Sequence, residues 1–529
     1  MSNVDVAAVE STDSEREESL IEAMMRPAFY PKLPTEVSHK ETHISHVFFA
    51  GDLVYKLKKP VRFSFLDYST LTKRRYYLQQ ELQLNRRLAP SVYLGVMPII
   101  CDEFGWRLGG WAVPREYTLV MRRLPEKRML PFLLETQQVT PDTMRDLGEH
   151  LAKFHATAER AHTADPAAYL SIMEDRWNDN LTVIEPFLES LADREALEAI
   201  KGFGAEFMRM HRDLLIRRTA QGWIRDIHGD LHAEHICFAP EGIQIFDCIE
   251  FSANLRRCDM ASEIAFLLMD LTVRGHGSLR EPLITGYRHQ LQDPDMPLLL
   301  PFYECYRALV RAKVSVLRLR KWSEDASRYF RYAARLTWQP LQPFLMLICG
   351  LSGSGKSTLA RELGERLGMT VINSDVVRKE IARKNGYSLA PINQGIYSPA
   401  MTTKTYRHMA REAERQIALG RGAILDATFV RRVHREKMAQ VAARHKVPIF
   451  LIRCFATDEL THRRLEARAA EGHDISEARW EIYLAQKTAW ESLGEISAEQ
   501  RLELDTAFSV EDLGRAVEMF LRSRLQQRS

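Results

Sequence analysis

The residue types and spacing best suited to chemistry occur in one stretch, Gly350–Thr358, which reads GLSGSGKST. This stretch fits the phosphate-binding loop pattern, in which a glycine, four arbitrary residues and Gly-Lys precede a serine or threonine. Glycines allow a backbone to wrap a triphosphate closely, and its N–H groups then point inward at the negative charge. We expect Lys356 to bridge the β- and γ-phosphates and Ser357 to supply a hydroxyl to Mg²⁺.

The sequence on both sides of this stretch favours phosphate binding over a glycine-rich turn that matches by chance. The apolar run Phe344–Cys349 reads as a buried strand, and the residues from Lys356 onward have helical composition. A helix at that place adds its positive end to the loop. The residues expected to bind ATP in this half are Gly350, Ser352, Gly353, Ser354, Gly355, Lys356, Ser357 and Thr358.

A second polar group follows the next predicted strand, residues 370–373. Asp375 comes just after that strand, and Arg378 lies about one helical turn further on. In a doubly wound sheet, ligands bind beyond the carboxyl ends of the strands. Asp375 is thus a candidate base for an acceptor hydroxyl, and Arg378 a candidate ligand for an anionic acceptor group. The alternative, that Ser374 or Asp375 only caps a helix, stays open.

Asp426 ends the third predicted strand, residues 423–427. A carboxylate at this place suits the orientation of the Mg²⁺ shell in proteins with this loop. A buried structural aspartate is the alternative.

The segment Thr461–Arg468 reads THRRLEAR and has the composition of a helix. Arg464 and Arg468 are four residues apart, so they share a helical face, and Arg463 lies beside it. Arginines on a mobile helical segment can close over phosphates and stabilise transition-state charge. A solvated charged face explains such a run equally well in many proteins.

These residues require a parallel sheet to position them. Trp338–Pro343, with two prolines, is the predicted linker, and after it short apolar runs alternate with helical patterns. Such alternation predicts an α/β domain whose parallel sheet is covered on both faces. The strands we expect are Phe344–Cys349, Thr370–Asn373, Ala423–Ala427, Pro448–Cys454 and Arg501–Asp505.

The first half has a different pattern, typical of an α+β domain. Thr42–Lys59 predicts a hairpin that turns at Gly51-Asp52, and 68–88 has helical spacing. Further strands are expected at 92–100 and 111–122, and mostly helices from Pro141 onward. The predicted organisation is a disordered acidic tail at 1–19, a first domain at 20–336, a linker at 337–343 and a second domain at 344–529.

From Phe344 to the C-terminus the chain resembles the small P-loop kinases related to zeta toxins, polynucleotide 5′-kinases and gluconate kinases. The motifs that carry this resemblance are GLSGSGKST, SDVVR, ILDATF and RRLEAR. The resemblance implies that the loop binds ATP, that Asp375 contacts or deprotonates the acceptor hydroxyl, and that Asp426 serves the metal. It also implies that Arg464 and Arg468 hold phosphates. The acceptor differs between members of this group.

From about His39 to Arg320 the chain resembles the aminoglycoside phosphotransferase family, on the motif HGDLHAEH and the later IQIFD. The resemblance makes Lys56 the lysine that holds the α- and β-phosphates, and Glu81 its helix partner. It makes Asp230 the base for the acceptor and Asp247 a Mg²⁺ ligand. By the same resemblance, Asp259 stabilises the loop that carries the HGD motif.

The chain departs from that family at His235, where the family has an asparagine that binds the second Mg²⁺. A neutral imidazole ligates softer ions better than Mg²⁺, and a protonated one repels cations. The first domain is thus expected to be a slow or metal-selective phosphotransferase or a pseudokinase. A zinc site of His228, His232, His235 and Cys237 is the weaker alternative, because no second ligand pair stands at finger spacing.

The composition suits a cytoplasmic protein of two or three domains. Net charge is +3, which indicates neither a nucleic-acid nor a membrane partner, although a local basic groove is compatible with it. Seven scattered cysteines without a C-x-x-C pair favour a reducing compartment. We expect no secretory signal and no membrane span.

Together these features predict a Mg²⁺- and ATP-dependent kinase that phosphorylates an alcohol group of a small hydroxylated substrate. One alternative is an ATP-driven switch with little phosphotransfer. A nucleic-acid 5′-end kinase is another, and it would need a basic, aromatic groove. Asp375 with Arg378 favours the enzyme over the switch, because a pure switch needs no acceptor base.

Overall fold

The computed structural model describes residues 18–63, 66–161, 165–384, 398–471 and 480–525. Residues 1–17 of the tail predicted at 1–19 lie outside these ranges. The chain divides into two compact units. The first unit comprises Met1–Asn180 and Ala205–Arg311, and the second Leu181–Gly204 and Ala312–Ser529. The domain limits predicted from the sequence stay a prediction. None of the helices in the described ranges has the length and apolar character that a membrane crossing requires.

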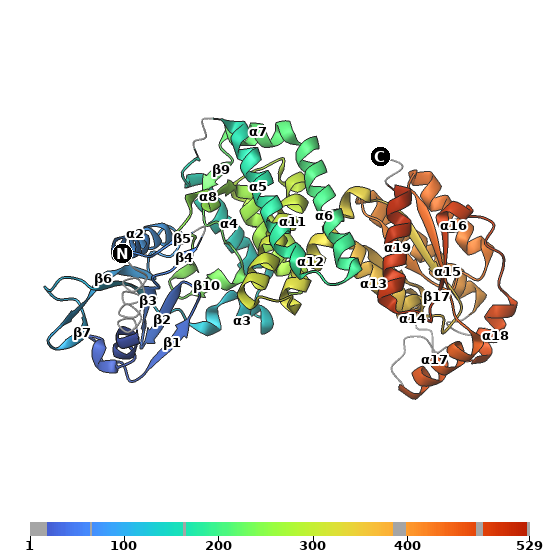
Figure 1. Ribbon diagram of the computed structural model, residues 1–529. Coiled ribbons are helices and arrows are strands. Elements are labelled where there is room, and N and C mark those ends of the chain that lie inside the picture. Colours follow the sequence, from blue (N-terminus) through green and yellow to red (C-terminus); the bar gives the residue numbers. More distant parts are fainter. Residues whose placement is uncertain (1–17, 64–65, 162–164, 385–397, 472–479, 526–529) are drawn as a thin grey trace, which may run out of the picture. The chain divides into compact units, whose positions relative to one another are not determined.

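An antiparallel sheet begins the first unit (Figure 1, blue). The hairpin predicted in Thr42–Lys59 is present, with Ala50 paired to Leu53 across the turn. The strand expected at 111–122 begins only at Glu116, and Pro114 just before it has no backbone N–H to donate to a neighbouring strand. The strand order is β1-β2-β3-β8-β6-β7. Its strands are β1 (Val37–Glu41), β2 (Ser45–Ala50), β3 (Leu53–Lys58), β6 (Tyr93–Asp102), β7 (Gly105–Leu108) and β8 (Glu116–Arg122).

Helix α2 (Leu71–Asn85) packs against β6 and β8 and matches the predicted helix. Its first turn is capped by Thr70, whose side chain accepts a hydrogen bond from the backbone N–H of Lys73. Packed in this way, α2 places the fully buried Glu81 beside β3, the strand that carries Lys56.

Helices dominate the chain from Pro141, as predicted. Helix α9 is buried along most of its length, and α10 packs closely on α4. A short helix, α3 (Leu130–Glu135), precedes this part. The helices that follow are α4 (Pro141–Thr157), α5 (Pro166–Ile184), α6 (Leu191–Met210), α7 (Arg212–Gln221), α8 (Ala253–Arg256), α9 (Met260–Val273), α10 (Arg280–Gln290), α11 (Met296–Leu319) and α12 (Glu324–Leu336).

The segment between α7 and α9 folds into two small antiparallel ladders. In one, β9 (Ile224–Asp226) pairs with β12 (Arg257–Asp259); in the other, β10 (Ile236–Ala239) pairs with β11 (Gly242–Ile245). The second ladder brings His235, the last residue of the motif HGDLHAEH, close to Phe246, which follows β11. Asp247 follows β11 with a φ of 63°, the left-handed region that favours glycine.

The second unit contains the five parallel strands that the sequence predicts, in the order β14-β15-β13-β16-β17. The phosphate loop follows the central strand, since β13 pairs with both β15 and β16. These strands are β13 (Leu345–Cys349), β14 (Thr370–Asn373), β15 (Ala423–Asp426), β16 (Ile449–Phe455) and β17 (Arg501–Asp505).

Both faces of this sheet are covered, as expected. Alternate side chains of β13 enter different cores: Leu345 and Leu347 pack with α15 and α16, while Met346 and Ile348 pack with α13 and α19. The helices of this part are α13 (Lys356–Leu367), α14 (Ser374–Lys384), α15 (Pro399–Ala418), α16 (Arg432–His445), α17 (Asp458–Glu471), α18 (Trp480–Thr488) and α19 (Val510–Leu525).

The segment predicted as a linker is partly packed. Trp338 is 1% exposed and belongs to the core of the second unit, with the Arg522 guanidinium 4.1 Å from the centre of its ring. A short 3-10 turn, Gln339–Leu341, follows it.

Candidate functional site

The phosphate loop joins the central strand β13 to helix α13, as its motif requires. Gly350 has φ 152° and Gly353 φ 79°, and a Cβ at Gly350 would lie 2.4 Å from the carbonyl oxygen of Cys454. A side chain is therefore excluded at Gly350 by the neighbouring strand as well as disfavoured by its backbone. Lys356 and Ser357 open α13, so the positive end of that helix lies at the loop.

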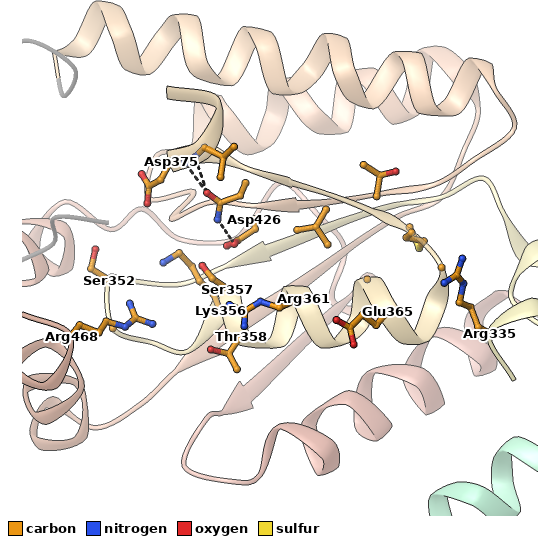
Figure 2. Close-up of a pocket in the computed structure, with 18 residues that line it drawn as sticks. Arg335, Ser352, Lys356, Ser357, Thr358, Arg361, Glu365, Asp375, Asp426 and Arg468 are labelled. Carbon is orange, nitrogen blue, oxygen red and sulfur yellow. Dashed lines mark hydrogen bonds between the residues drawn. The ribbon is translucent and has the colours of Figure 1, made fainter. Parts of the chain in front are cut away.

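A cavity of about 580 Å³ adjoins the loop and extends along α13 (Figure 2). Asp375 and Asp426 lie on one side of Lys356 and Ser357, and Arg335 lies toward the other end of the helix. The predicted residues that line this cavity are Ser352, Gly353, Lys356, Ser357, Thr358, Asp375, Asp426 and Arg468.

Three predicted loop residues lie elsewhere. Gly350 and Ser354 line a separate cavity of about 410 Å³, which Tyr483 and Trp490 also line. Gly355 faces Thr506, the residue after β17, since a Cβ at Gly355 would lie 3.2 Å from that of Thr506. Their part in nucleotide binding stays a prediction.

Asp426 is 1% exposed and lies at the end of β15. Its Oδ2 accepts a hydrogen bond of 2.6 Å from the side-chain amide of Asn373. Its Oδ1 is buried and has no hydrogen-bond partner among the described residues. A buried carboxylate oxygen without a partner fits a cation as its ligand, and carboxylate with the Ser357 hydroxyl is the oxygen donor set that Mg²⁺ prefers.

Asn373 also caps helix α14. Its Oδ1 accepts hydrogen bonds from the backbone N–H groups of Asp375 (2.9 Å) and Val376 (3.0 Å). The alternative in which Ser374 or Asp375 caps this helix is therefore wrong, because both residues already lie inside α14. The Asp375 carboxylate is partly exposed to the cavity and pairs with the Arg378 guanidinium.

The two arginines predicted to hold phosphates have different surroundings. Arg468 lines the cavity, whereas the Arg464 guanidinium donates to the Thr506 hydroxyl at 2.8 Å and to its carbonyl at 2.6 Å. The following helix also reaches the loop, because the backbone N–H of Ser352 donates to the Gln486 side chain of α18 at 2.9 Å.

In the first unit, the predicted lysine and its partners meet. Lys56 Nζ lies 2.7 Å from Glu81 and 3.0 Å from Asp247. Burial lowers the pKa of Lys56, but the carboxylates of Asp247, Glu81 and Glu250 outweigh it and raise that pKa above its usual range. The Lys56 ammonium in turn holds the pKa of Asp247 well below its usual range. The predicted Lys56–Glu81 pair is thus formed.

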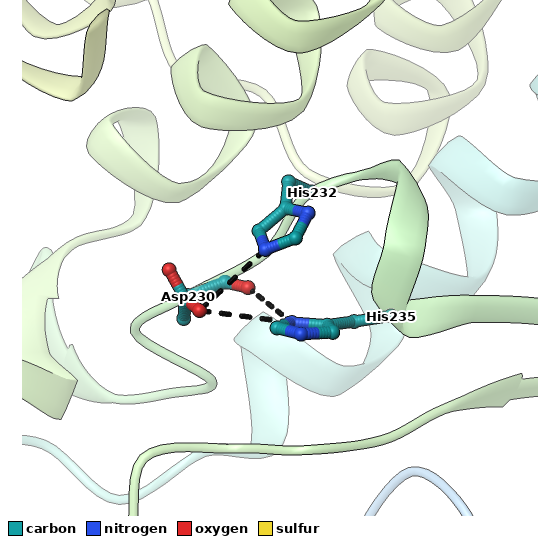
Figure 3. Close-up of side chains that lie close together, drawn as sticks. All are labelled: Asp230, His232 and His235. Atoms are coloured by element: carbon teal, nitrogen blue, oxygen red, sulfur yellow. Dashed lines mark hydrogen bonds and ion pairs between the residues drawn. The ribbon is translucent and has the colours of Figure 1, made fainter. Parts of the chain in front are cut away.

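Asp230 lies among histidines (Figure 3). Its Oδ2 is 3.6 Å from His232 Nε2, and its carbonyl oxygen accepts a hydrogen bond of 2.8 Å from His235 Nδ1. Burial raises the pKa of Asp230, but the nearby His232 imidazole and the positive charge of Arg311 contribute to a pKa well below the usual range. Burial lowers the pKa of His235 to about 4, so its imidazole is neutral at pH 7.

The four-ligand zinc site, which the sequence left as the weaker alternative, is not formed. His228 Nε2 lies 2.8 Å from the Phe246 carbonyl, and burial raises the pKa of Cys237 to about 11, so its thiol stays protonated. Among the described residues, the group spaced to hold a metal is Asp230, His232 and His235. An imidazole at position 235 is a poor ligand for Mg²⁺, so this part of the first unit does not fit that ion.

The loop of the HGD motif is braced by Glu263, which the sequence did not indicate. Its carboxylate accepts from the backbone N–H groups of His228 (3.2 Å) and Gly229 (2.6 Å). The side chain of Asp259, predicted for this role, instead pairs with Arg218 and caps α9. The assignment to Asp259 is therefore wrong.

Two sequence profiles match the chain in these two parts. The profile described as "Phosphotransferase enzyme family" matches residues 76–302, and that described as "AAA domain" matches residues 345–492. The predicted combination of a phosphotransferase domain with a P-loop kinase domain is confirmed, and so is the fold class, α+β followed by α/β.

Two bacterial proteins are similar over most of their length. The chain is 31% identical over 458 residues to the uncharacterised protein Rv2004c of Mycobacterium tuberculosis, with 86% of this chain and 90% of that protein covered. The same values hold for the uncharacterised protein Mb2027c of Mycobacterium bovis.

Two solved structures resemble parts of the chain. A choline/ethanolamine kinase family protein from Mesorhizobium loti covers 60% of this chain and 93% of its own, with 15% identity and a TM-score of 0.39. A gluconokinase from Sinorhizobium meliloti covers 35% and 95%, with 16% identity and a TM-score of 0.27. Such distant likenesses carry no conclusion about a substrate.

Proposed function

The chain belongs to the family of the mycobacterial protein Rv2004c, and from that premise we propose that its second unit is an ATP-dependent kinase acting on an alcohol group. A phosphotransferase activity is the general expectation for both domain types. The finer assignment rests on one observation. One cavity is lined by a loop that can bind phosphate, by the candidate base Asp375 and by Asp426, whose buried Oδ1 has no hydrogen-bond partner in the described part of the chain.

In the proposed reaction, the acceptor hydroxyl oxygen attacks the γ-phosphorus of ATP, and the bond from that phosphorus to the β–γ bridging oxygen breaks. Asp375 takes the hydroxyl proton, ADP leaves, and the acceptor becomes a phosphate monoester. Lys356 binds the β- and γ-phosphates, and Arg468 stabilises the charge that develops on the transferred group. Asp426 and Ser357 would hold Mg²⁺, which neutralises phosphate charge when bound.

The acceptor that fits best is a small hydroxylated molecule. Arg378 would orient an anionic group on it, and the near-neutral net charge gives no support to a nucleic-acid end as acceptor. The seven cysteines all lie within the described residues and form no disulfide with one another, which supports a reducing, cytoplasmic location.

An ATP-driven switch is the second candidate, and one contact favours it. The Gln486 side chain of helix α18 accepts a hydrogen bond from the Ser352 N–H of the phosphate loop. A nucleotide that binds at the loop would therefore change the contacts of that helix. The first unit, by this proposal, is a second phosphotransferase or a pseudokinase.

The test is transfer of labelled γ-phosphate from ATP to a panel of small hydroxylated compounds by the full-length protein. We expect label on an acceptor, lost in Lys356→Ala and in Asp375→Asn, with ATP binding retained in Asp375→Asn. Binding of ATP without transfer to any acceptor, together with an altered hydrogen exchange of α18, would support the switch instead. Transfer that persists in Lys356→Ala but disappears in Asp230→Asn would assign the chemistry to the first unit.

A further inference from the structure

His235 of the first unit has one ring nitrogen whose protonation is fixed by its neighbour. Nδ1 lies 2.8 Å from the carbonyl oxygen of Asp230 (Figure 3). A carbonyl oxygen can only accept a hydrogen bond, so Nδ1 must carry the proton. In the neutral ring, Nε2 is then a lone-pair donor, and a backbone carbonyl on the other nitrogen is the usual support of a metal-binding histidine.

That free lone pair faces a carboxylate. His235 Nε2 lies 3.6 Å from Asp247 Oδ2. Two acceptor atoms that face each other at this distance form no hydrogen bond, and their arrangement suits a shared cation. Metal–ligand bonds of about 2.0–2.2 Å place neighbouring ligand atoms roughly 3.0–3.6 Å apart. The other oxygen of Asp247 pairs with Lys56 at 3.0 Å, so Oδ2 is the one that faces the imidazole.

His232 is a worse ligand than its distance to Asp230 suggests. Its Nε2 lies 3.2 Å from the Arg311 guanidinium, which can only donate. The lone pair of that nitrogen is therefore engaged, and a positive charge lies beside it. The triad of Asp230, His232 and His235 thus cannot offer three ligand atoms in this arrangement, whereas His235 with Asp247 offers two.

We propose that His235 Nε2 and Asp247 Oδ2 hold a divalent first-row transition-metal ion, such as Mn²⁺ or Zn²⁺, in preference to Mg²⁺. Imidazole nitrogen favours such ions, while Mg²⁺ takes oxygen ligands and gives up water reluctantly. With two protein ligands, the ion keeps open positions for water or for the phosphates of a nucleotide. This site is separate from the proposed kinase centre of the second unit and does not depend on it.

The experiment uses the full-length protein carrying Asp426→Asn, which removes the candidate metal ligand of the second unit. Mn²⁺ alone is added and followed by electron paramagnetic resonance, with pulsed detection of nitrogen-14 coupled to the bound ion. We expect one nitrogen-coupled Mn²⁺, displaced by Mg²⁺ only at roughly tenfold or higher excess. Absence of nitrogen coupling, or displacement at equal concentration, overturns the proposal.

Matched variants identify the ligand. His235→Asn should abolish the nitrogen signal, weaken Mn²⁺ binding roughly tenfold and shift the preference toward Mg²⁺. His232→Asn should leave the nitrogen signal in place. The reverse pattern assigns the ion to the other histidine and refutes the proposed pair. Thermal unfolding and a His235→Gln variant guard against a folding defect, because Gln also lacks the imidazole nitrogen. Phosphate transfer lost in Lys356→Ala tests the kinase assignment separately.

Discussion

Asn373 joins the tips of two strands through a single side chain. Its amide donates to the Asp426 carboxylate at 2.6 Å, while its carbonyl oxygen caps helix α14. The same residue thus orients the candidate metal ligand and starts the helix that carries Asp375. Position 373 therefore links the geometry of the cavity to the stability of α14.

Two substitutions at Asn373 separate these contributions. Asn373→Ala should lower the free energy of unfolding by about 1 kcal/mol relative to Asn373→Ser, because serine still caps the helix. Both variants lack the amide that orients Asp426, so both should transfer phosphate more slowly. Denaturant unfolding and the labelled-phosphate assay measure the two effects. A serine variant as active as the wild type would show that the hydrogen bond to Asp426 has no part in the reaction.

The arginines of α17 should differ in function although they share a helical face. Arg468→Ala should lower kcat by about 10²–10³-fold, because it removes a cationic donor from the cavity. Arg464→Ala should chiefly cost stability, about 1 kcal/mol, because it removes the bonds to Thr506. Steady-state kinetics and thermal unfolding distinguish them. If Arg464→Ala lost kcat and kept its stability, the two roles would be exchanged.

Most strands of the second unit could be predicted because they contain a short apolar run, as LMLIC in β13 and IFLI in β16. β1 and β7 of the first unit were missed for the opposite reason. The sequence of β1, VSHKE, is polar and mostly exposed, and β7 has only four residues. Both lie at the edges of the sheet, where fewer side chains are buried and the strand need not be apolar.

The candidate site was predictable where a motif has fixed spacing, as in the phosphate loop. The role of Asn373 depends on Asp426, 53 positions away, and that of Gln486 on Ser352, 134 positions away. No local pattern reports such contacts. Asp259 and Glu263 are only four residues apart in the sequence. In the structure Asp259 pairs with Arg218, whereas Glu263 accepts a hydrogen bond from the backbone of the HGD loop.

The two lysines of β3 make a further matched pair. Lys58 is fully buried and lies 2.8 Å from Glu81, 2.5 Å from Glu250 and 3.2 Å from the Tyr68 hydroxyl. Lys58→Met should destabilise the first unit by about 3–5 kcal/mol, because buried carboxylates lose their shared cation. Lys56→Met should cost less, since Glu81 keeps Lys58. Hydrogen exchange of peptides from β3 and α2 measures both, and equal protection in the two variants would contradict the expectation.

Acid should destabilise the first unit through Glu263. Burial raises the pKa of this carboxyl, but the hydrogen bonds from His155 and from the Gly229 N–H outweigh it, so the pKa lies below its usual range. A carboxyl whose pKa is lower in the folded protein stabilises it above the unfolded pKa of about 4.3. That contribution is lost as the pH falls through the folded pKa.

Glu263→Gln tests this, because glutamine keeps the shape of the side chain but does not ionise. At pH 7 the variant should be less stable by about 1–3 kcal/mol, since it weakens the hydrogen bonds that brace the HGD loop. From pH 6 to 3 its stability should fall less steeply than that of the wild type. The exposed Glu126→Gln serves as a control that should keep the wild-type slope. Unfolding curves for the first unit, collected by hydrogen exchange across this range, measure the slopes, and identical slopes for Glu263→Gln and wild type would place the acid sensitivity in another group.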